Sequence, residues 1–170
     1  MASTGGLKVV AQGDREIVMT RVFDAPRTMV FEAWTKPELL KRWLLGPPGW
    51  TMTVCEVDLR VGGAYRFVWR RDRVAGDAET PHTMGMGGVY REITAPARLV
   101  STEEFDDAWY PGNALNTLEM IEKDGKTTLV NTVLYDSREA RDGVLKSPME
   151  QGVAASYDRL ADLLAKAETR

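Results

Sequence analysis

The sequence predicts an α+β fold in which about seven antiparallel strands form one curved sheet, two short helices follow the first strand, and a long C-terminal helix packs across the sheet. Three observations support this prediction: strand-like segments alternate with turn signals, the end of the chain has helical periodicity, and 170 residues suffice for one core. We expect residues 1–13, which are glycine-rich and weakly periodic, to be a flexible leader. Residues 14–170 are then expected to form a single domain.

The first strand and the two short helices are predicted between residues 17 and 46. The run at residues 17–23 is rich in β-branched side chains, which suits a strand. Asp24 is a candidate N-cap, and the ring of Pro26 suits a first helical turn. Pro37 begins a second helical stripe, and the glycines and prolines at residues 46–49 end it.

Six further strands are predicted from alternating side chains and turn signals. Tyr65, Phe67 and Trp69 alternate with more polar neighbours, so they share one face of a strand. Asp124-Gly125 is typical of a tight hairpin turn. We interpret the glycines of Gly85-Met86-Gly87-Gly88 as permitting close approach of a neighbouring backbone or side chain. The six predicted strands span residues 50–58, 64–71, 83–93, 98–105, 114–122 and 126–135.

A long helix is predicted at the C-terminus. Ser147-Pro148-Met149-Glu150 has the pattern of a capping box, in which the serine and the glutamate satisfy free backbone amides of the first turn. Apolar residues then recur at steps of three and four positions, which gives the helix one side suited to burial. These residues are Met149, Val153, Tyr157, Leu160, Leu164 and Ala167.

Composition excludes several functional classes. The net charge of −3 gives no basic excess for binding nucleic acid or an anionic membrane, and no apolar run approaches the roughly 20 residues of a membrane-spanning helix. Cys55 and His82 are the only cysteine and histidine, so we expect neither an intrachain disulfide nor a transition-metal site. A cytoplasmic protein without a cofactor is the expectation.

The abundance of soft and aromatic side chains suggests a ligand cavity. The chain has eight methionines, five tryptophans, five tyrosines and four phenylalanines. These residues either fill the core or line an apolar pocket that a long helix leaves over a curved sheet, and the sequence leaves both alternatives open. The candidate lining residues are Tyr65, Phe67, Trp69, Met84, Met86, Met149, Val153 and Tyr157.

Three titratable residues are candidates for acid/base chemistry. Glu103 and Glu119 lie on predicted strands, where an inward carboxylate would have a raised pKa, and His82 lies in a polar stretch. Each of them would act only if its side chain faced a cavity. No residue is assigned a catalytic role on this basis.

The chain contains an ordered set of short motifs: Asp24-Ala25-Pro26, Trp34, Pro37-Glu38-Leu39, Trp43, Gly46-Pro47, residues 58–63 and 88–93, Met149-Glu150-Gln151-Gly152 and Tyr157-Asp158-Arg159-Leu160. This set resembles the activator of heat-shock protein 90 ATPase homologue-like branch of the START/SRPBCC superfamily, which includes Bet v-like and polyketide cyclase-like proteins. The resemblance covers about residues 14–167. It implies a helix-grip fold, in which a curved sheet wraps the C-terminal helix around a hydrophobic cavity.

The sequence departs from this family pattern at Leu44 and Val153, where the family often has aromatic residues, and the smaller side chains would enlarge or reshape the cavity. The resemblance leads us to expect a protein that binds a small apolar or aromatic molecule. One alternative is an enzyme that resembles the polyketide cyclases and dehydratases. The other is an activator of the chaperone, although 170 residues leave no room for the separate chaperone-binding domain of the eukaryotic co-chaperone.

Overall fold

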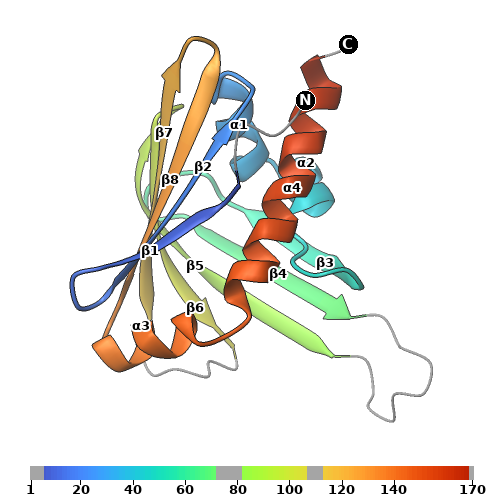
Figure 1. Cartoon of the computed structure of the whole chain (residues 1–170). Coiled ribbons are helices and arrows are strands. Elements are labelled where there is room, and N and C mark those ends of the chain that lie inside the picture. The colour runs from blue at the N-terminus through green and yellow to red at the C-terminus, as the bar shows by residue number, and fades with distance from the viewer. Residues whose placement is uncertain (1–5, 72–81, 107–112, 169–170) are drawn as a thin grey trace.

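The computed structural model describes residues 6–71, 82–106 and 113–168, and it arranges them as one antiparallel sheet with helices on its concave side (Figure 1). The elements follow one another in the order β1 (Lys8–Gln12), β2 (Glu16–Phe23), α1 (Arg27–Thr35), α2 (Pro37–Trp43), β3 (Trp50–Val57), β4 (Ala64–Arg71), β5 (Thr83–Thr94), β6 (Arg98–Phe105), β7 (Ala114–Lys123), β8 (Lys126–Tyr135), α3 (Arg138–Leu145) and α4 (Met149–Glu168).

The strands of the described chain lie in the order β1-β2-β8-β7-β6-β5-β4-β3. The sheet therefore has eight strands where the sequence predicts about seven, because β1 forms within the segment expected to be a flexible leader. That prediction is wrong for residues 8–12, which pair with β2 from Lys8 opposite Thr20 to Gln12 opposite Glu16. Hydrogen bonds to the next strand order this segment, although its side chains are mostly exposed. Residues 1–5 lie outside the described residues.

The two short helices form as predicted, and two tryptophans join them. The indole N–H of Trp43 donates a hydrogen bond of 2.9 Å to the carbonyl oxygen of Ala33, and the rings of Trp34 and Trp43 meet edge to face at 4.7 Å. Trp43 is fully buried. The first helix starts after Pro26, which makes no side-chain capping bond, so the predicted cap at Asp24 is not the one used.

The C-terminal helix α4 begins at Met149, one residue after the proline that the capping pattern places at the first helical position. The hydroxyl of Ser147 accepts a hydrogen bond of 3.2 Å from the backbone N–H of Met149. The preceding helix α3 was not predicted, and Ser137 caps it by accepting a 3.0 Å hydrogen bond from the N–H of Ala140. At about 1.5 Å per residue, the 20 residues of α4 extend roughly 30 Å along the sheet.

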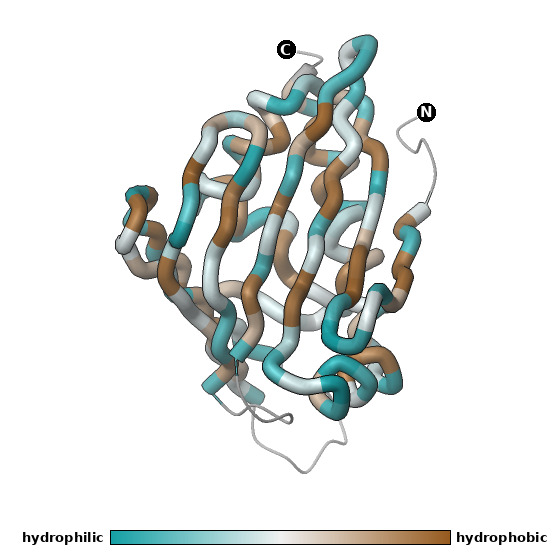
Figure 2. Tube along the Cα trace, turned by 90° about the vertical axis from the view of Figure 1, so that its left-hand side faces the viewer, coloured by the Kyte–Doolittle hydropathy of each residue, from teal (hydrophilic) through white to brown (hydrophobic). Residues whose placement is uncertain are grey.

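The sheet curves around α4, with α1 and α2 beside the helix on the same side (Figure 1). Figure 2 shows the alternation of apolar and polar residues along its strands. From its middle onward, α4 buries Tyr157, Leu160 and Leu164 in the main core, where Tyr157 meets the rings of Phe23 and Trp43. The N-terminal half of α4 is less deeply packed, because Met149 and Val153 are only half-buried.

The glycines of β5 permit close approach on both sides of the strand. A Cβ atom at Gly88 would lie 1.9 Å from the carbonyl oxygen of Thr102, and one at Gly85 would lie 2.4 Å from the carboxylate of Asp106. That carboxylate accepts two hydrogen bonds, of 2.7 and 2.6 Å, from the guanidinium of Arg66. Gly85 thus leaves room for an ion pair that crosses β5 and joins β4 to the end of β6.

Candidate ligand-binding cavity

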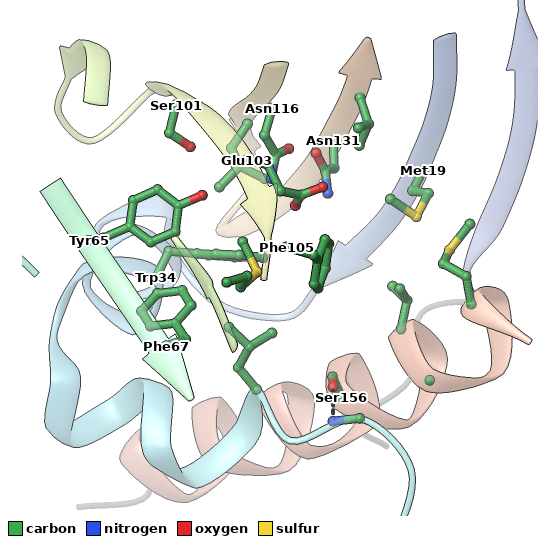
Figure 3. A pocket seen from close by; sticks show the side chains of 18 of the residues that line it. Met19, Trp34, Tyr65, Phe67, Ser101, Glu103, Phe105, Asn116, Asn131 and Ser156 are labelled. Carbon is green, nitrogen blue, oxygen red and sulfur yellow. Dashed lines mark hydrogen bonds between the residues drawn. The ribbon is translucent and has the colours of Figure 1, made fainter. Parts of the chain in front are cut away.

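A cavity of about 310 Å³ lies between the concave face of the sheet and α4 (Figure 3). Its wall is built from β2, the strands β4 to β8, α1, α4 and the segment that follows α2. The volume falls at the lower end of the roughly 300–1,000 Å³ that is usual for small-molecule sites. Aromatic and aliphatic side chains make up most of the wall.

Seven of the eight residues predicted from the sequence line this cavity. They are Tyr65, Phe67 and Trp69 of β4, Met86 of β5, and Met149, Val153 and Tyr157 of α4.

The eighth residue, Met84, does not line the cavity and is 42% exposed. It pairs with Trp69 near the end of the β4–β5 hairpin that projects past α4 (Figure 1). The indole of Trp69 donates a 2.7 Å hydrogen bond to the carbonyl oxygen of Leu44, whereas the side chain of Met84 remains exposed. The prediction is therefore wrong for Met84, although strand alternation puts it on the same face as Met86.

Three polar side chains meet on the sheet side of the cavity, and we call them the acceptor cluster: Glu103 of β6, Asn116 of β7 and Asn131 of β8. They point toward one another in Figure 3. Strand register brings them together, because Asn116 lies opposite Ser101, two residues from Glu103, and also opposite Val133, two residues from Asn131.

The acceptor cluster contains buried oxygens that lack partners. Neither Asn116 Oδ1 nor Asn131 Oδ1 has a hydrogen-bond partner within the described chain. No hydrogen bond or ion pair with another described residue engages the carboxylate of Glu103, and burial raises the pKa of this group to about 7. Burial also raises the pKa of the nearby Tyr157 hydroxyl, an effect that Asn131 partly opposes. Unsatisfied buried acceptors of this kind are uncommon in folded proteins.

The sequence pointed to Glu103 as a candidate inward carboxylate, but the two asparagines were missed. The sequence does mark both asparagines, because each is a polar residue at an inward-facing position of a strand. Asn116 stands in the alternating series Ala114, Leu118, Met120, all of which are buried, so it is a polar residue at an inward position. Asn131 interrupts the buried series of β8 in the same way.

The other two acid/base candidates lie away from the cavity. Glu119 is on the outer face of the sheet, where its carboxylate is 3.3 Å from the guanidinium of Arg98. His82 is exposed next to β5, and its ring lies 6.3 Å from that of Trp50. The acid/base hypothesis is therefore wrong for Glu119 and His82, and only Glu103 faces the cavity.

Two hydrogen bonds hold the segment after α2 at the edge of the cavity. The backbone N–H of Gly46 donates a 2.8 Å hydrogen bond to the hydroxyl of Ser156 on α4, drawn as the dashed line in Figure 3. The indole of Trp69 anchors Leu44 from the opposite side. This segment therefore bridges β4 and α4 along the cavity.

Neither a cluster of metal-ligating side chains nor a membrane-spanning helix is found in the described part of the chain. Within residues 6–71, 82–106 and 113–168, no three histidine, cysteine or carboxylate side chains gather in a way that would hold a metal ion. Cys55 is a free, half-buried thiol on β3. No helix in these ranges combines the length and the apolar character needed to span a membrane.

The curved sheet, the helix lying along it and the cavity between them define a helix-grip protein of the START/SRPBCC class. The family model described as "Activator of Hsp90 ATPase homolog 1-like protein" matches residues 24–165. The chain belongs to this family. No curated protein matches the sequence.

Solved structures share the fold over nearly the whole chain. A protein from Rhodobacter sphaeroides is 30% identical, with a TM-score of 0.85 over 95% of this chain and 99% of that one. A protein from Mycobacterium smegmatis is 22% identical, with a TM-score of 0.78 over 96% and 99% of the two chains. An HSP90 activator from Plasmodium falciparum is 22% identical, with a TM-score of 0.53 over 78% of this chain and 88% of that one. The likeness to the last two is one of fold.

Proposed function

We propose that this protein binds a small molecule with an apolar or aromatic body in the cavity between the sheet and α4. The observation that carries the proposal is the volume of about 310 Å³ enclosed by predominantly aromatic and aliphatic side chains. Transfer of an apolar ligand from water to such a wall is favourable by roughly 25 cal/mol per Å² of apolar surface removed from water. The anchored segment around Gly46 supports a preformed site, because less ordering is then required on binding.

The proposal is tested by calorimetric titration with two neutral probes, 2-naphthylmethanol and 1-octanol. We expect saturable binding of at least one probe to the unmodified protein. The variant Val153→Phe fills the cavity from α4 and is expected to weaken this binding by about tenfold or more, since a side chain then occupies the ligand volume.

A matched variant adds the same ring outside the cavity. Ala165 is exposed on the same helix, so Ala165→Phe leaves the cavity volume unchanged and is expected to leave the affinity unchanged. Absence of saturable binding of both probes to the unmodified protein would refute the proposal. So would equal binding by the unmodified protein and a folded Val153→Phe variant.

A second candidate function is an enzyme of the cyclase or dehydratase type, and one observation favours it. Glu103 faces the cavity, and its pKa of about 7 suits transfer of a proton near neutral pH. Such an enzyme would require turnover that disappears in Glu103→Gln while ligand binding persists. The third candidate, activation of the chaperone ATPase, rests on the family resemblance alone.

A further inference from the structure

We propose that the cavity selects a ligand whose apolar body ends in a protonated amine, and that the acceptor cluster of Glu103, Asn116 and Asn131 binds the ammonium group. This inference rests on the proposed binding function and names the chemical class of the ligand.

The hydrogen-bonding capacity of the cluster matches an ammonium group. A primary ammonium has three N–H donors and no acceptor. The cluster consists of a carboxylate and two amides, one group from each of three adjacent strands, and their side chains converge in Figure 3. The oxygens of both amides are buried and have no partner in the described chain, so the carboxylate is the acceptor that a ligand in the cavity meets first. An ammonium can donate to this carboxylate, and rotation of the amide groups would offer their unpaired oxygens to its other N–H donors.

The charge of the cavity favours a cation. Neither lysine, arginine nor histidine occurs among the described residues that line it, so no basic side chain of the wall offsets the carboxylate of Glu103. Arg21 is buried nearby, but its guanidinium is 2.7 Å from the carboxylate of Asp158 and lies over the ring of Phe23. A ligand carboxylate would add a second negative charge beside Glu103, whereas an ammonium would supply the missing counter-ion.

Aromatic rings complete the site. Trp34, Tyr65, Phe67 and Phe105 line the same cavity and lie to one side of the cluster in Figure 3. Aromatic faces attract cations and also offer a flat apolar surface to the body of the ligand. Burial holds the pKa of Glu103 at about 7, and a bound ammonium would lower it by favouring the ionised carboxylate.

The experiment uses three ligands with one naphthyl body and different polar ends: 2-naphthylmethylamine, 2-naphthylmethanol and 2-naphthoate. Calorimetric titrations at pH 8 measure each dissociation constant for the unmodified full chain. We expect the amine to bind about tenfold or more tightly than the alcohol, and the carboxylate to bind most weakly, since only the amine pairs with the charge of Glu103.

Two substitutions, each of which removes one negative charge, distinguish the effect of a carboxylate in the cavity from the effect of the net charge of the protein. Glu103→Gln is expected to abolish the preference for the amine over the alcohol. Glu119→Gln is the matched control, because this carboxylate lies on the outer face beside Arg98, and it is expected to preserve the preference. Asn116→Leu removes one acceptor without a change of charge and is expected to reduce the preference, which provides a second variant if Glu103→Gln fails to fold.

The outcomes separate this inference from the function on which it rests. Equal affinities for the amine and the alcohol would overturn the inference and leave the binding function standing. An unchanged preference in folded Glu103→Gln would do the same. If none of the three ligands binds, and 1-octanol also fails to bind, both proposals fall.

Discussion

The backbone N–H of Gly46 donates a hydrogen bond of 2.8 Å to the hydroxyl of Ser156, which links the segment after α2 to the helix α4. Both residues line the cavity, and Ser156 is buried. Gly46 has a φ of 68°, a left-handed conformation that suits glycine, so the tight turn that presents this N–H depends on the residue type. A backbone contact between distant parts of the chain thus fixes one edge of the cavity.

Removal of this contact should destabilise the protein modestly. We expect Ser156→Ala to lower the free energy of unfolding by about 1 kcal/mol, because the half-buried N–H of Gly46 loses its acceptor. Urea denaturation measures the change. Thr53→Ala is the control: its hydroxyl makes a hydrogen bond to the backbone as well, as donor to the carbonyl oxygen of Val68, but at an exposed site, so a smaller loss is expected. Equal losses in the two variants would contradict the structural role of Ser156.

Glu103 should make the stability of the protein depend on pH. Its pKa of about 7 in the folded chain exceeds the ordinary value near 4.3, so the folded state binds more protons between these limits. Stability is therefore expected to fall as pH rises from about 4.5 to 7 and to remain lower above pH 7. Glu103→Gln removes this effect, so its stability relative to the unmodified protein should rise over that range by about 3 kcal/mol.

Other titrating groups of the wall do not mask this effect. Burial raises the pKa of Tyr90 and of Tyr157 in the wall well above the ordinary tyrosine value, so both stay neutral between pH 4.5 and 8. Thermal or urea unfolding at pH 4.5, 6, 7 and 8 provides the measurement. A difference between variant and unmodified protein that stays constant across this range would show that Glu103 ionises normally.

The two halves of α4 should respond differently to truncation. Leu160 is fully buried in the core, and Leu160→Ala is expected to cost about 2–5 kcal/mol through loss of packing and creation of a cavity. Val153 already borders open space, so Val153→Ala is expected to cost about 1 kcal/mol. Urea denaturation of both variants measures the contrast. Comparable losses would mean that the space beside Val153 is filled.

Cys55 should react slowly with thiol reagents. Burial raises the pKa of its thiol, an effect that Lys41 partly opposes, so less thiolate is present at pH 7.5 than in a free cysteine. Because the chain has one cysteine, the release of chromophore from an aromatic disulfide reagent reports on this site alone. The folded protein is expected to react about tenfold more slowly than the chain in urea. Equal rates would contradict the burial of Cys55.

Local patterns made most elements predictable. Alternation and turn chemistry were enough for strands β2 to β8, and the pattern at Ser147 located the start of α4. β1 was missed because its side chains are mostly exposed and its order comes from pairing with β2. Helix α3 was missed because it is short and polar, with Gly143 in its interior.

The cavity residues also fall into two groups: those that local periodicity predicts and those that only tertiary structure brings together. Seven of the eight predicted lining residues could be found, because strand and helix periodicity determines which side chains share the inner face. Met84 shares that periodicity but is exposed and does not line the cavity, since periodicity carries no information on how far along a strand the cavity extends. Asn116 and Asn131 meet Glu103 only through the register of three strands.

The sequence by itself determined the class of fold, the family and the inward-facing sides of the strands and the last helix, because these depend on short-range periodicity and on ordered motifs. Tertiary structure alone decided whether the apolar surface of α4 is filled or hollow. The apolar residues of α4 recur at regular spacing along the whole helix. Leu160 nevertheless packs in the core, while Val153 borders a cavity. The difference arises from the local separation of helix and curved sheet, which only the assembled fold sets.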